Sequence, residues 1–531
     1  MDRLAPGILF LYLLYAVLLT IPVSLVLIWW YKTAVGRSMA VAGTADLPAA
    51  TDYLAPPIAT SPRSPGLQNL EARVRLRLSV VYIFAALCAA LFWTLLLFRS
   101  GGLDFTPLRG FIVTYTYAWP AVPTLIALLA LDRRRSFQVL LGYVALGVLA
   151  TVLWSAISQS ISGSRATSPW MNGWQAARLI AVTASLPGLI LLIVANRRIR
   201  GVSPLVLAGL LVFTFSAAFF NEFLIRLADH SGLLRVLFVF GATRMGLWFM
   251  LATVPVGYLC WRLLVLLNRQ FQRKSFSDMQ FLADSFWIIV SFAIAADLAT
   301  SLGWKGLWAL GGFAVYRAVV SIGFALWRAP REPGVSLLVL RVFGFQRRTE
   351  KLFDSVVLRW RFRGPVRMIA GTDLAARTID PDDSLAFASG ALRTRFVGTA
   401  DDLTSRLRQL DEARDPDGHF RVTEFFCRAN TWTHALVALL ARSDAILMDL
   451  RGFNQNRSGC LFELDQLKLH GRLPQTIFVV DSNTDLNLLN STLSQIGAGF
   501  APLHLEEVKT DSIQARNRVY RALESLNPGH V

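Results

Sequence analysis

Long apolar runs in the first 330 residues constrain this chain more than any other feature of its sequence. As a helix, a run of about 20 apolar residues crosses the hydrocarbon core of a bilayer, which is ~30 Å thick. These runs predict a polytopic α-helical membrane domain over residues 1–330, with the lipid bilayer as its partner. We identify nine runs of sufficient length, at residues 7–31, 78–98, 108–131, 137–157, 178–196, 202–221, 245–267, 284–303 and 306–327.

The first run also resembles the apolar core of a signal peptide. Its apolar core is longer than the roughly 7–15 residues that such a core contains, so we expect an uncleaved anchor. The four cysteines of the chain form no C-x-x-C pair, which indicates neither a disulfide framework nor a zinc site. This cysteine usage suits a reducing cytoplasm.

The net charge of +18 is divided unevenly along the chain. Residues 1–330 contain 27 Lys and Arg against 11 Asp and Glu, whereas residues 331–531 contain 26 against 24. The basic excess therefore lies in the membrane half, where Lys and Arg mark cytoplasmic loops. A nucleic-acid-binding protein would carry this charge on its soluble domain, so we expect no nucleic-acid partner.

Basic residues concentrate in alternate loops between the predicted spans, and only the loop 222–244 weakens the contrast. The positive-inside rule then predicts a multi-pass protein of the cell inner membrane, with a periplasmic N-terminus and a cytoplasmic C-terminal domain. The segment 40–70 is rich in Pro, Ala, Ser and Thr and predicts a disordered cytoplasmic loop. Residues 233–242 predict either a short interfacial helix or a part of the seventh span.

Two charged residues lie inside predicted spans, Asp297 in the eighth and Arg317 in the ninth. Ionisable residues within a bilayer are candidate functional sites. They are equally candidates for a structural ion pair between neighbouring antiparallel helices. Measured from the turn between the two helices, Asp297 lies about 9 Å deep and Arg317 about 20 Å, so direct pairing requires an extended arginine side chain. Both the structural role and an ion- or ligand-binding role remain open.

After residue 330 the long apolar runs give way to short ones that alternate with helical patterns. Solid apolar strands that alternate with helices predict one α/β domain over residues 331–531, with a mainly parallel sheet covered on both faces. We expect strands at 335–342, 366–370, 421–427, 445–449, 476–480 and 503–505, and helices at 350–360, 400–413, 431–441, 459–469, 485–496 and 512–526. The expected core side chains are Leu337, Val339, Ile369, Phe425, Ile446, Met448 and Phe478.

The stretch 445–469 has the pattern of a functional site. An apolar strand ends on Asp449, a polar loop that contains Arg451 follows, and a helix begins at Gly459 and carries Glu463 one turn in. In parallel α/β sheets, ligands bind beyond the carboxyl ends of the strands. Arg451 is a candidate for a bidentate phosphate contact. The structural alternatives are a helix-start carboxylate without catalytic use for Glu463 and a loop cap for Asp449.

The segment 431–464 (TWTHALVALLARSDAILMDLRGFNQNRSGCLFEL) resembles a stretch shared by Toll/interleukin-1-receptor (TIR) domains and nucleoside 2-deoxyribosyltransferases. In both families a helix, a Ser-Asp pair, an apolar strand and a polar loop precede a helix that carries Glu-Leu. In the enzymes of this superfamily the glutamate acts at the anomeric carbon of a ribosyl group, and it matches Glu463. Ser458 and Gly459 resemble the small-residue lead-in, and Asp449 matches a carboxylate often found at that strand end. The TIR Trp-Cys pair is not intact.

The resemblance implies a Rossmann-like (TIR/flavodoxin-like) sheet and further substrate-binding residues. Arg341 lies in a segment that resembles the first-strand loop of the nucleotide pocket, and Asp373 follows the second strand. The implied function is a membrane-anchored glycohydrolase of NAD or another nucleotide, or a signalling effector, with NAD as substrate, no cofactor and no metal. The alternative is a non-catalytic nucleotide- or protein-binding sensor coupled to the membrane domain. A transporter with a regulatory domain and a homo-oligomer also remain open.

Overall fold

The computed structural model describes residues 6–40, 67–102, 104–131, 133–162, 169–194, 199, 202–230, 242–329, 334–341, 348–370, 381–390, 392–410, 412–428, 431–494, 504–508 and 512–526. Packing divides the chain into two units. Unit 1 comprises Met1–Trp29, Leu76–Arg328 and Asp380–Ser389, and unit 2 comprises Trp30–Arg75, Ala329–Ile379 and Gly390–Val531. Most of the predicted loop 40–70, and most of the segment 233–242, lie outside the described residues.

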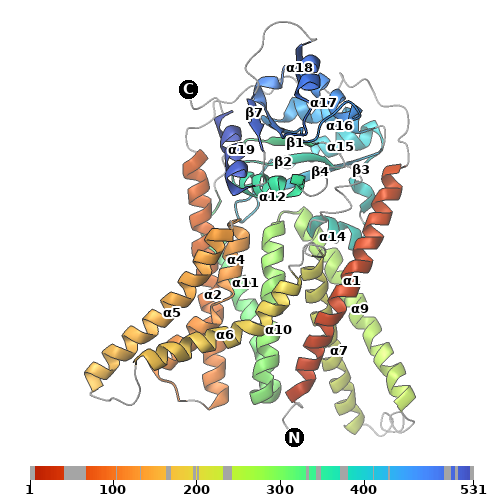
Figure 1. Ribbon diagram of the computed structural model, residues 1–531. Helices are drawn as coiled ribbons and strands as arrows, with labels where there is room; N and C mark the ends of the chain where they lie inside the picture. Colours follow the sequence, from red (N-terminus) through yellow and green to blue (C-terminus); the bar gives the residue numbers. More distant parts are fainter. Residues whose placement is uncertain are drawn as a thin grey trace. The chain divides into compact units, whose positions relative to one another are not determined.

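Unit 1 is built from helices (Figure 1). α1 and α2 are each one continuous helix, whose end and beginning, respectively, belong to unit 2. The described helices are α1 (Pro6–Ala40), α2 (Leu67–Gly101), α3 (Pro107–Tyr117), α4 (Ala121–Leu128), α5 (Arg133–Ser162), α6 (Pro169–Val194), α7 (Ser203–His230), α9 (Ala242–Gln272), α10 (Asp278–Leu302), the 3-10 helix η2 (Gly303–Leu310), α11 (Gly311–Leu326) and, from later in the sequence, α14 (Pro381–Ala388).

Each predicted span overlaps at least one described helix. The third span is broken, because α3 ends at Tyr117 and α4 begins only after Pro120. Among the described residues, six helical segments are long and apolar enough to cross a membrane, which agrees with a multi-pass protein. They are Leu11–Met39, Asn69–Gly101, Pro107–Leu128, Arg134–Ser160, Asp278–Leu302 and Lys305–Leu326. The number and direction of the crossings stay predictions.

Aromatic side chains fill the interior of unit 1 around α10. The ring of Trp287 on α10 stacks between Trp93 of α2 and Tyr316 of α11, with centroid separations of 6.1 and 4.3 Å. Buried indole N–H groups require acceptors. The indole N–H of Trp287 donates to Thr124 Oγ1 at 3.1 Å, and that of Trp93 donates to the Ala309 carbonyl at 2.7 Å.

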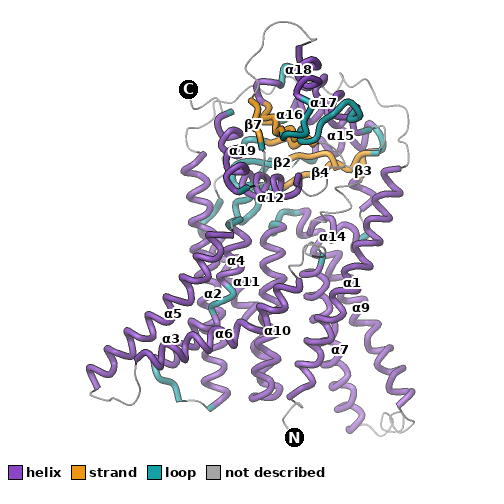
Figure 2. Tube along the Cα trace, viewed as in Figure 1, coloured by secondary structure: helices purple, strands orange, loops and turns teal. Residues whose placement is uncertain are grey.

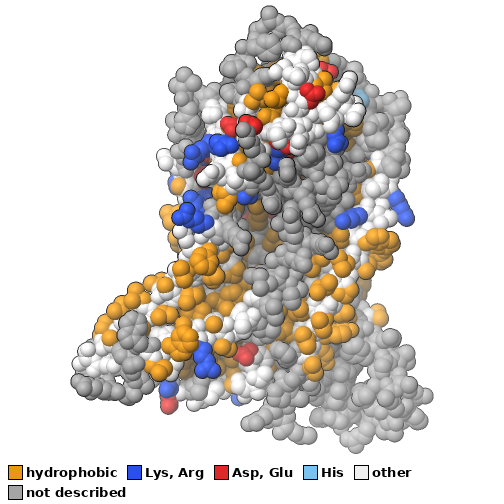
Figure 3. Space-filling view, viewed as in Figure 1, with side chains coloured by type: hydrophobic (Ala, Val, Ile, Leu, Met, Phe, Trp, Pro, Cys, Tyr) orange, Lys and Arg blue, Asp and Glu red, His pale blue; other side chains and the backbone are white. Residues whose placement is uncertain are grey.

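The outer surfaces of α1 and α5 carry apolar side chains (Figure 3). A water-soluble surface does not normally expose a continuous apolar patch of this kind, whereas a lipid-facing surface does. Exposed members on these two helices include Leu11, Leu18, Leu25, Trp29, Phe137, Leu141, Leu146, Leu149, Leu153 and Ile157.

Unit 2 contains a seven-stranded sheet, whose strands are orange in Figure 2. The strand order is β3-β4-β2-β1-β5-β6-β7, and every pair is parallel. This confirms the predicted parallel sheet. The strands are β1 (Leu337–Arg341), β2 (Val366–Ala370), β3 (Phe396–Val397), β4 (Val422–Cys427), β5 (Ala445–Asp449), β6 (Thr476–Val480) and β7 (His504–Glu507). The helices of this unit are α12 (Arg348–Trp360), α15 (Ala400–Arg408), α16 (Trp432–Arg442), α17 (Ser458–Leu469), α18 (Leu486–Ser494) and α19 (Ile513–Ser525), with the 3-10 helices η3 (Leu392–Arg395) and η4 (Leu473–Gln475).

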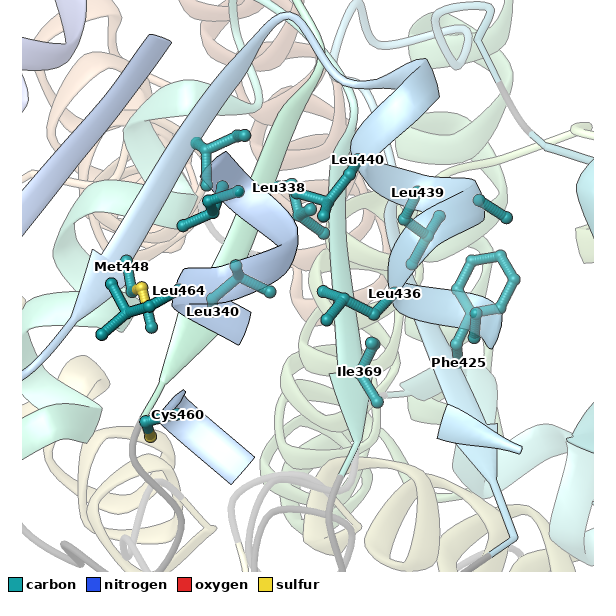
Figure 4. Close-up of a cluster of buried hydrophobic side chains, with 14 of the residues drawn as sticks. Leu338, Leu340, Ile369, Phe425, Leu436, Leu439, Leu440, Met448, Cys460 and Leu464 are labelled. Carbon is teal, nitrogen blue, oxygen red and sulfur yellow. The ribbon is translucent and has the colours of Figure 1, made fainter. Parts of the chain in front are cut away.

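Helices cover both faces of the sheet. One core lies between the sheet and helices α15 to α18, and Figure 4 shows Leu338, Leu340, Ile369 and Met448 within it. A second core lies between the opposite face and helices α12 and α19. Because successive strand residues point to opposite faces, strands buried on both sides must be apolar throughout. All seven predicted core residues are buried, which confirms that expectation.

The first turns of α2 are held in unit 2 by an ion-pair network. Arg363, in the turn that precedes β2, lies 3.1 Å from Glu71 of α2 and 2.5 Å from Glu524 of α19. Its guanidinium also lies 5.4 Å from the ring centroid of Tyr520. One cation thus joins α2, the start of a central strand and the last helix.

Candidate functional site

The strand order reverses at the pair β1 and β5. After β1 the chain forms β2, β3 and β4 on one side of it, and from β5 it proceeds through β6 and β7 on the other. In open parallel sheets this reversal, at the carboxyl ends of the strands, is where ligands bind. We call these strand ends the carboxyl edge. Arg341 and Asp449, the last residues of β1 and β5, are partners in the strand register and therefore adjacent at this edge.

Asp449 and Arg451 form a buried ion pair, with each residue only 2% exposed. The Arg451 Nε donates to Asp449 Oδ1 at 2.8 Å, and Nη2 donates to Oδ2 at 2.7 Å. The backbone N–H of Arg451 also donates to Oδ1, at 3.1 Å. This bidentate geometry directs the guanidinium toward Asp449. A phosphate contact by Arg451, which the sequence suggested, would have to share the guanidinium with this carboxylate.

Glu463 lies in the second turn of α17 and is 3% exposed. Its charge acts on Cys460, one turn earlier on the same helix. The pKa of the Cys460 thiol is raised to about 12, chiefly by burial and next by the negative charge of Glu463. Asp449 raises it further, whereas Arg457 opposes the shift. Two buried carboxylates, one at the end of β5 and one on α17, therefore act on the same thiol.

Asp481 is a site residue that the sequence analysis missed. It directly follows β6 and is buried. Its Oδ1 accepts hydrogen bonds from the backbone N–H of Gly452 at 3.0 Å, from that of Asn483 at 3.1 Å and from Thr484 Oγ1 at 3.1 Å. Asp481 thereby fixes the turn after Arg451, where Gly452 adopts a φ of +71°. A carboxylate directly after an apolar strand was the available signal, as at Asp449.

Trp432, at the start of α16, supports the start of α17. Its ring meets Phe462 edge to face, with centroids 5.4 Å apart. A Cβ placed on Gly459 would meet only the far end of the Trp432 ring, at 4.0 Å. The first turn of α17 therefore packs against this indole.

The remaining predicted site residues are placed as follows. Ser458 begins α17 and is exposed, and Gly459 is partly buried. Arg341 is described only in its backbone, as the last residue of β1. Asp373 lies outside the described residues. The structure thus brings Asp449, Arg451 and the start of α17 together, and their role in substrate binding stays a prediction.

Arg317, one of the two charged residues inside predicted spans, pairs with a carboxylate other than Asp297. Arg317 of α11 lies 3.3 Å from Asp284 of α10, near the buried ring of Tyr316. The alternative of a direct ion pair between Asp297 and Arg317 is therefore wrong. Asp297 follows Asp284 by 13 residues, which is about 20 Å along a helix, so one arginine cannot reach both. Asp297 is exposed on the surface of α10. Asp284 was overlooked because it stands at the first position of the predicted span.

In the part of the chain that the structure describes, no three His, Cys, Asp or Glu side chains are grouped to hold a metal ion. The chain matches no family model, no curated protein and no solved structure. The resemblance to TIR domains and nucleoside 2-deoxyribosyltransferases stays a prediction from the sequence.

Proposed function

We propose that this chain is a membrane-anchored nucleotide glycohydrolase, in which Glu463 acts on the N-glycosidic bond of NAD or a related nucleoside. The observation that carries the proposal is the placement of two buried carboxylates, Asp449 and Glu463, around Cys460 beside the reversal of strand order. The strand order supports a Rossmann-like assignment, because without β3 it is the 3-2-1-4-5-6 order of dinucleotide-binding folds.

The chemistry requires one carboxylate close to the anomeric carbon. As the bond from C1′ to the base nitrogen breaks, its electron pair leaves with the base and positive charge develops on the ribosyl group. A carboxylate stabilises that charge or attacks C1′ as a nucleophile. Water then supplies the hydroxyl group at C1′ and releases one proton. Glu463 fits this role because it is buried, and electrostatic interactions are stronger in a site that excludes water.

A non-catalytic nucleotide-binding sensor is the second candidate. The Asp449–Arg451 pair favours it, because a carboxylate held by a guanidinium and by a backbone N–H fixes the loop and is not free to act on a substrate. Such a module would bind a nucleotide and transmit the occupancy of the site to the membrane helices without turnover.

The test is release of free base from NAD and from nucleosides by the full chain in lipid nanodiscs. Glu463→Gln preserves shape and removes the charge, so we expect turnover to fall by about three orders of magnitude. Asp465→Asn is the matched control, because Asp465 is an exposed carboxylate on the same helix and should keep normal turnover. Equal turnover in the parent and in Glu463→Gln refutes the catalytic assignment. Binding without turnover in the parent supports the sensor.

We also propose an inner-membrane location with a periplasmic N-terminus, which the alternating basic loops support. A topology reporter fused after Val531 should be active in the cytoplasm, and one inserted in the loop 158–177 should be active in the periplasm. Two reporters on the same side would show that the number of spans between them is wrong by an odd number.

A further inference from the structure

The helix α14 (Pro381–Ala388) lies between β2 and β3 in the sequence but packs as a part of unit 1. Leu385, which is fully buried, joins an apolar cluster with Phe271 at the end of α9, Phe276 in the following turn and Phe281 at the start of α10. Directly after the helix, Ser389 Oγ accepts a hydrogen bond from Asn268 Nδ2 at 2.9 Å. Apolar and polar contacts together anchor α14 to the α9–α10 turn.

The connection from α14 to the sheet is short. Only six residues separate Ser389 from Phe396, the first residue of β3. Gly390 has a φ of +77°, a conformation that glycine adopts without strain, and the 3-10 helix η3 (Leu392–Arg395) takes up most of the remainder. A connection that is short and largely helical transmits a displacement better than a flexible loop does.

β3 in turn contacts the segment that supports the candidate site. The carbonyl of Val397 accepts a hydrogen bond from Thr431 Oγ1 at 2.7 Å, and Thr431 is fully buried. The next residue is Trp432, whose ring supports the first turn of α17 at Gly459 and Phe462. A continuous series of contacts therefore leads from β3 to the helix that carries Glu463.

We propose that α14 is the element through which the membrane helices regulate the nucleotide site. A shift of the α9–α10 turn would displace α14 and β3, and Thr431 and Trp432 would pass this displacement to the start of α17. Thr431 and Trp432 are positioning residues in this scheme, since they act through α17. The inference rests on the proposed function for the identity of the ligand. By linkage, a nucleotide that prefers one position of α17 would also bias the membrane helices.

Hydrogen exchange of the full chain in nanodiscs tests this coupling, with NAD turnover measured on the same samples. Leu385→Asp places a charge in the apolar cluster and should undock α14. We expect amide exchange to accelerate roughly tenfold over residues 271–281, and also over 459–463 at the start of α17. Ala388→Ser is the matched control, because Ala388 is exposed on the same helix and its replacement should leave both segments unchanged.

Two further variants make the outcome decisive. Thr431→Val keeps the shape of the side chain and removes the hydrogen bond to Val397, so in this background Leu385→Asp should affect residues 271–281 only. Asn268→Ala loosens α14 from the unit 1 side and should reproduce a weaker form of the effect if Leu385→Asp does not fold. If exchange over 459–463 stays unchanged in Leu385→Asp, the proposed coupling between α14 and α17 is overturned. Unchanged exchange over 271–281 also overturns it, because α14 would then not be anchored to the α9–α10 turn. Absence of NAD turnover in the parent would refute the proposed reaction alone, because the exchange data decide the coupling independently.

Discussion

Replacement of Arg363 should destabilise unit 2 by several times more than replacement of an exposed arginine. Its side chain is 7% exposed and lies 3.1 Å from Glu71 and 2.5 Å from Glu524. A hydrogen bond between charged groups contributes about 1.5–3 kcal/mol, and removal of one member of a buried pair costs about 3–5 kcal/mol. The two glutamates keep partial contact with water, with 15% and 22% of their side chains exposed. We therefore expect Arg363→Met to cost about 3 kcal/mol.

Arg518→Met is the matched control in the same unit. Arg518 is 58% exposed and lies 3.9 Å from Glu506, and exposed pairs of this kind contribute about 0–1 kcal/mol. Pulse proteolysis of the full chain in detergent, across a series of urea concentrations, measures the free energy of unfolding of the sheet. A second comparison isolates the network. Glu71→Gln should cost less in the Arg363→Met background than in the parent, because only the pair of Glu71 with Arg75, at 3.0 Å, is then left to lose. Equal losses in Arg363→Met and Arg518→Met would refute the reasoning.

Three other predictions concern single side chains. Burial, and then the negative charge of Glu463, raise the pKa of the Cys460 thiol, so Glu463→Gln should accelerate alkylation of Cys460 at pH 9, measured by mass spectrometry. Asp284→Asn leaves Arg317 without its carboxylate and should lower the thermal stability of unit 1, whereas Asp297→Asn on the helix surface should not. Burial, and then Arg472, lower the pKa of His470 below 6.5, so the folded state binds protons less readily than the unfolded state. Unit 2 should therefore lose stability as the pH falls through 6.5, and this loss should be smaller in His470→Gln.

Three inner strands could be predicted from the sequence to the residue. β2, β5 and β6 begin and end at the predicted positions, because each is a solid apolar run bounded by polar or turn residues. β3 was missed, since two residues carry no periodicity. α14 was missed because its burial depends on phenylalanines far away in the sequence. Local patterns therefore predicted the elements that are buried by their neighbours in the sheet, and failed where a distant partner provides the burial.

In the candidate site, too, some features could be predicted from the sequence and others could not. The positions of Asp449 at a strand end and of Glu463 near a helix start followed from spacing alone. The engagement of Arg451 by Asp449 did not, because a residue pattern does not show which of several acceptors a guanidinium will meet. The choice of Asp284 over Asp297 by Arg317 depends on the relative axial position of α10 and α11, which packing determines. Side-chain partners thus required the structure, whereas the placement of Asp449 on a strand and of Glu463 on a helix did not.

Each of the two units contains a segment from the other half of the sequence, which determines how this protein could be divided. A fragment that starts at residue 331 would retain α14 without the phenylalanines that bury Leu385, and would lack Glu71, a partner of Arg363. A membrane fragment that ends at residue 330 would lose α14 in return. Neither half can therefore be transferred alone to another protein. A gene fusion that joins this sheet to other membrane helices would have to include the start of α2 with Glu71 and the partners of α14.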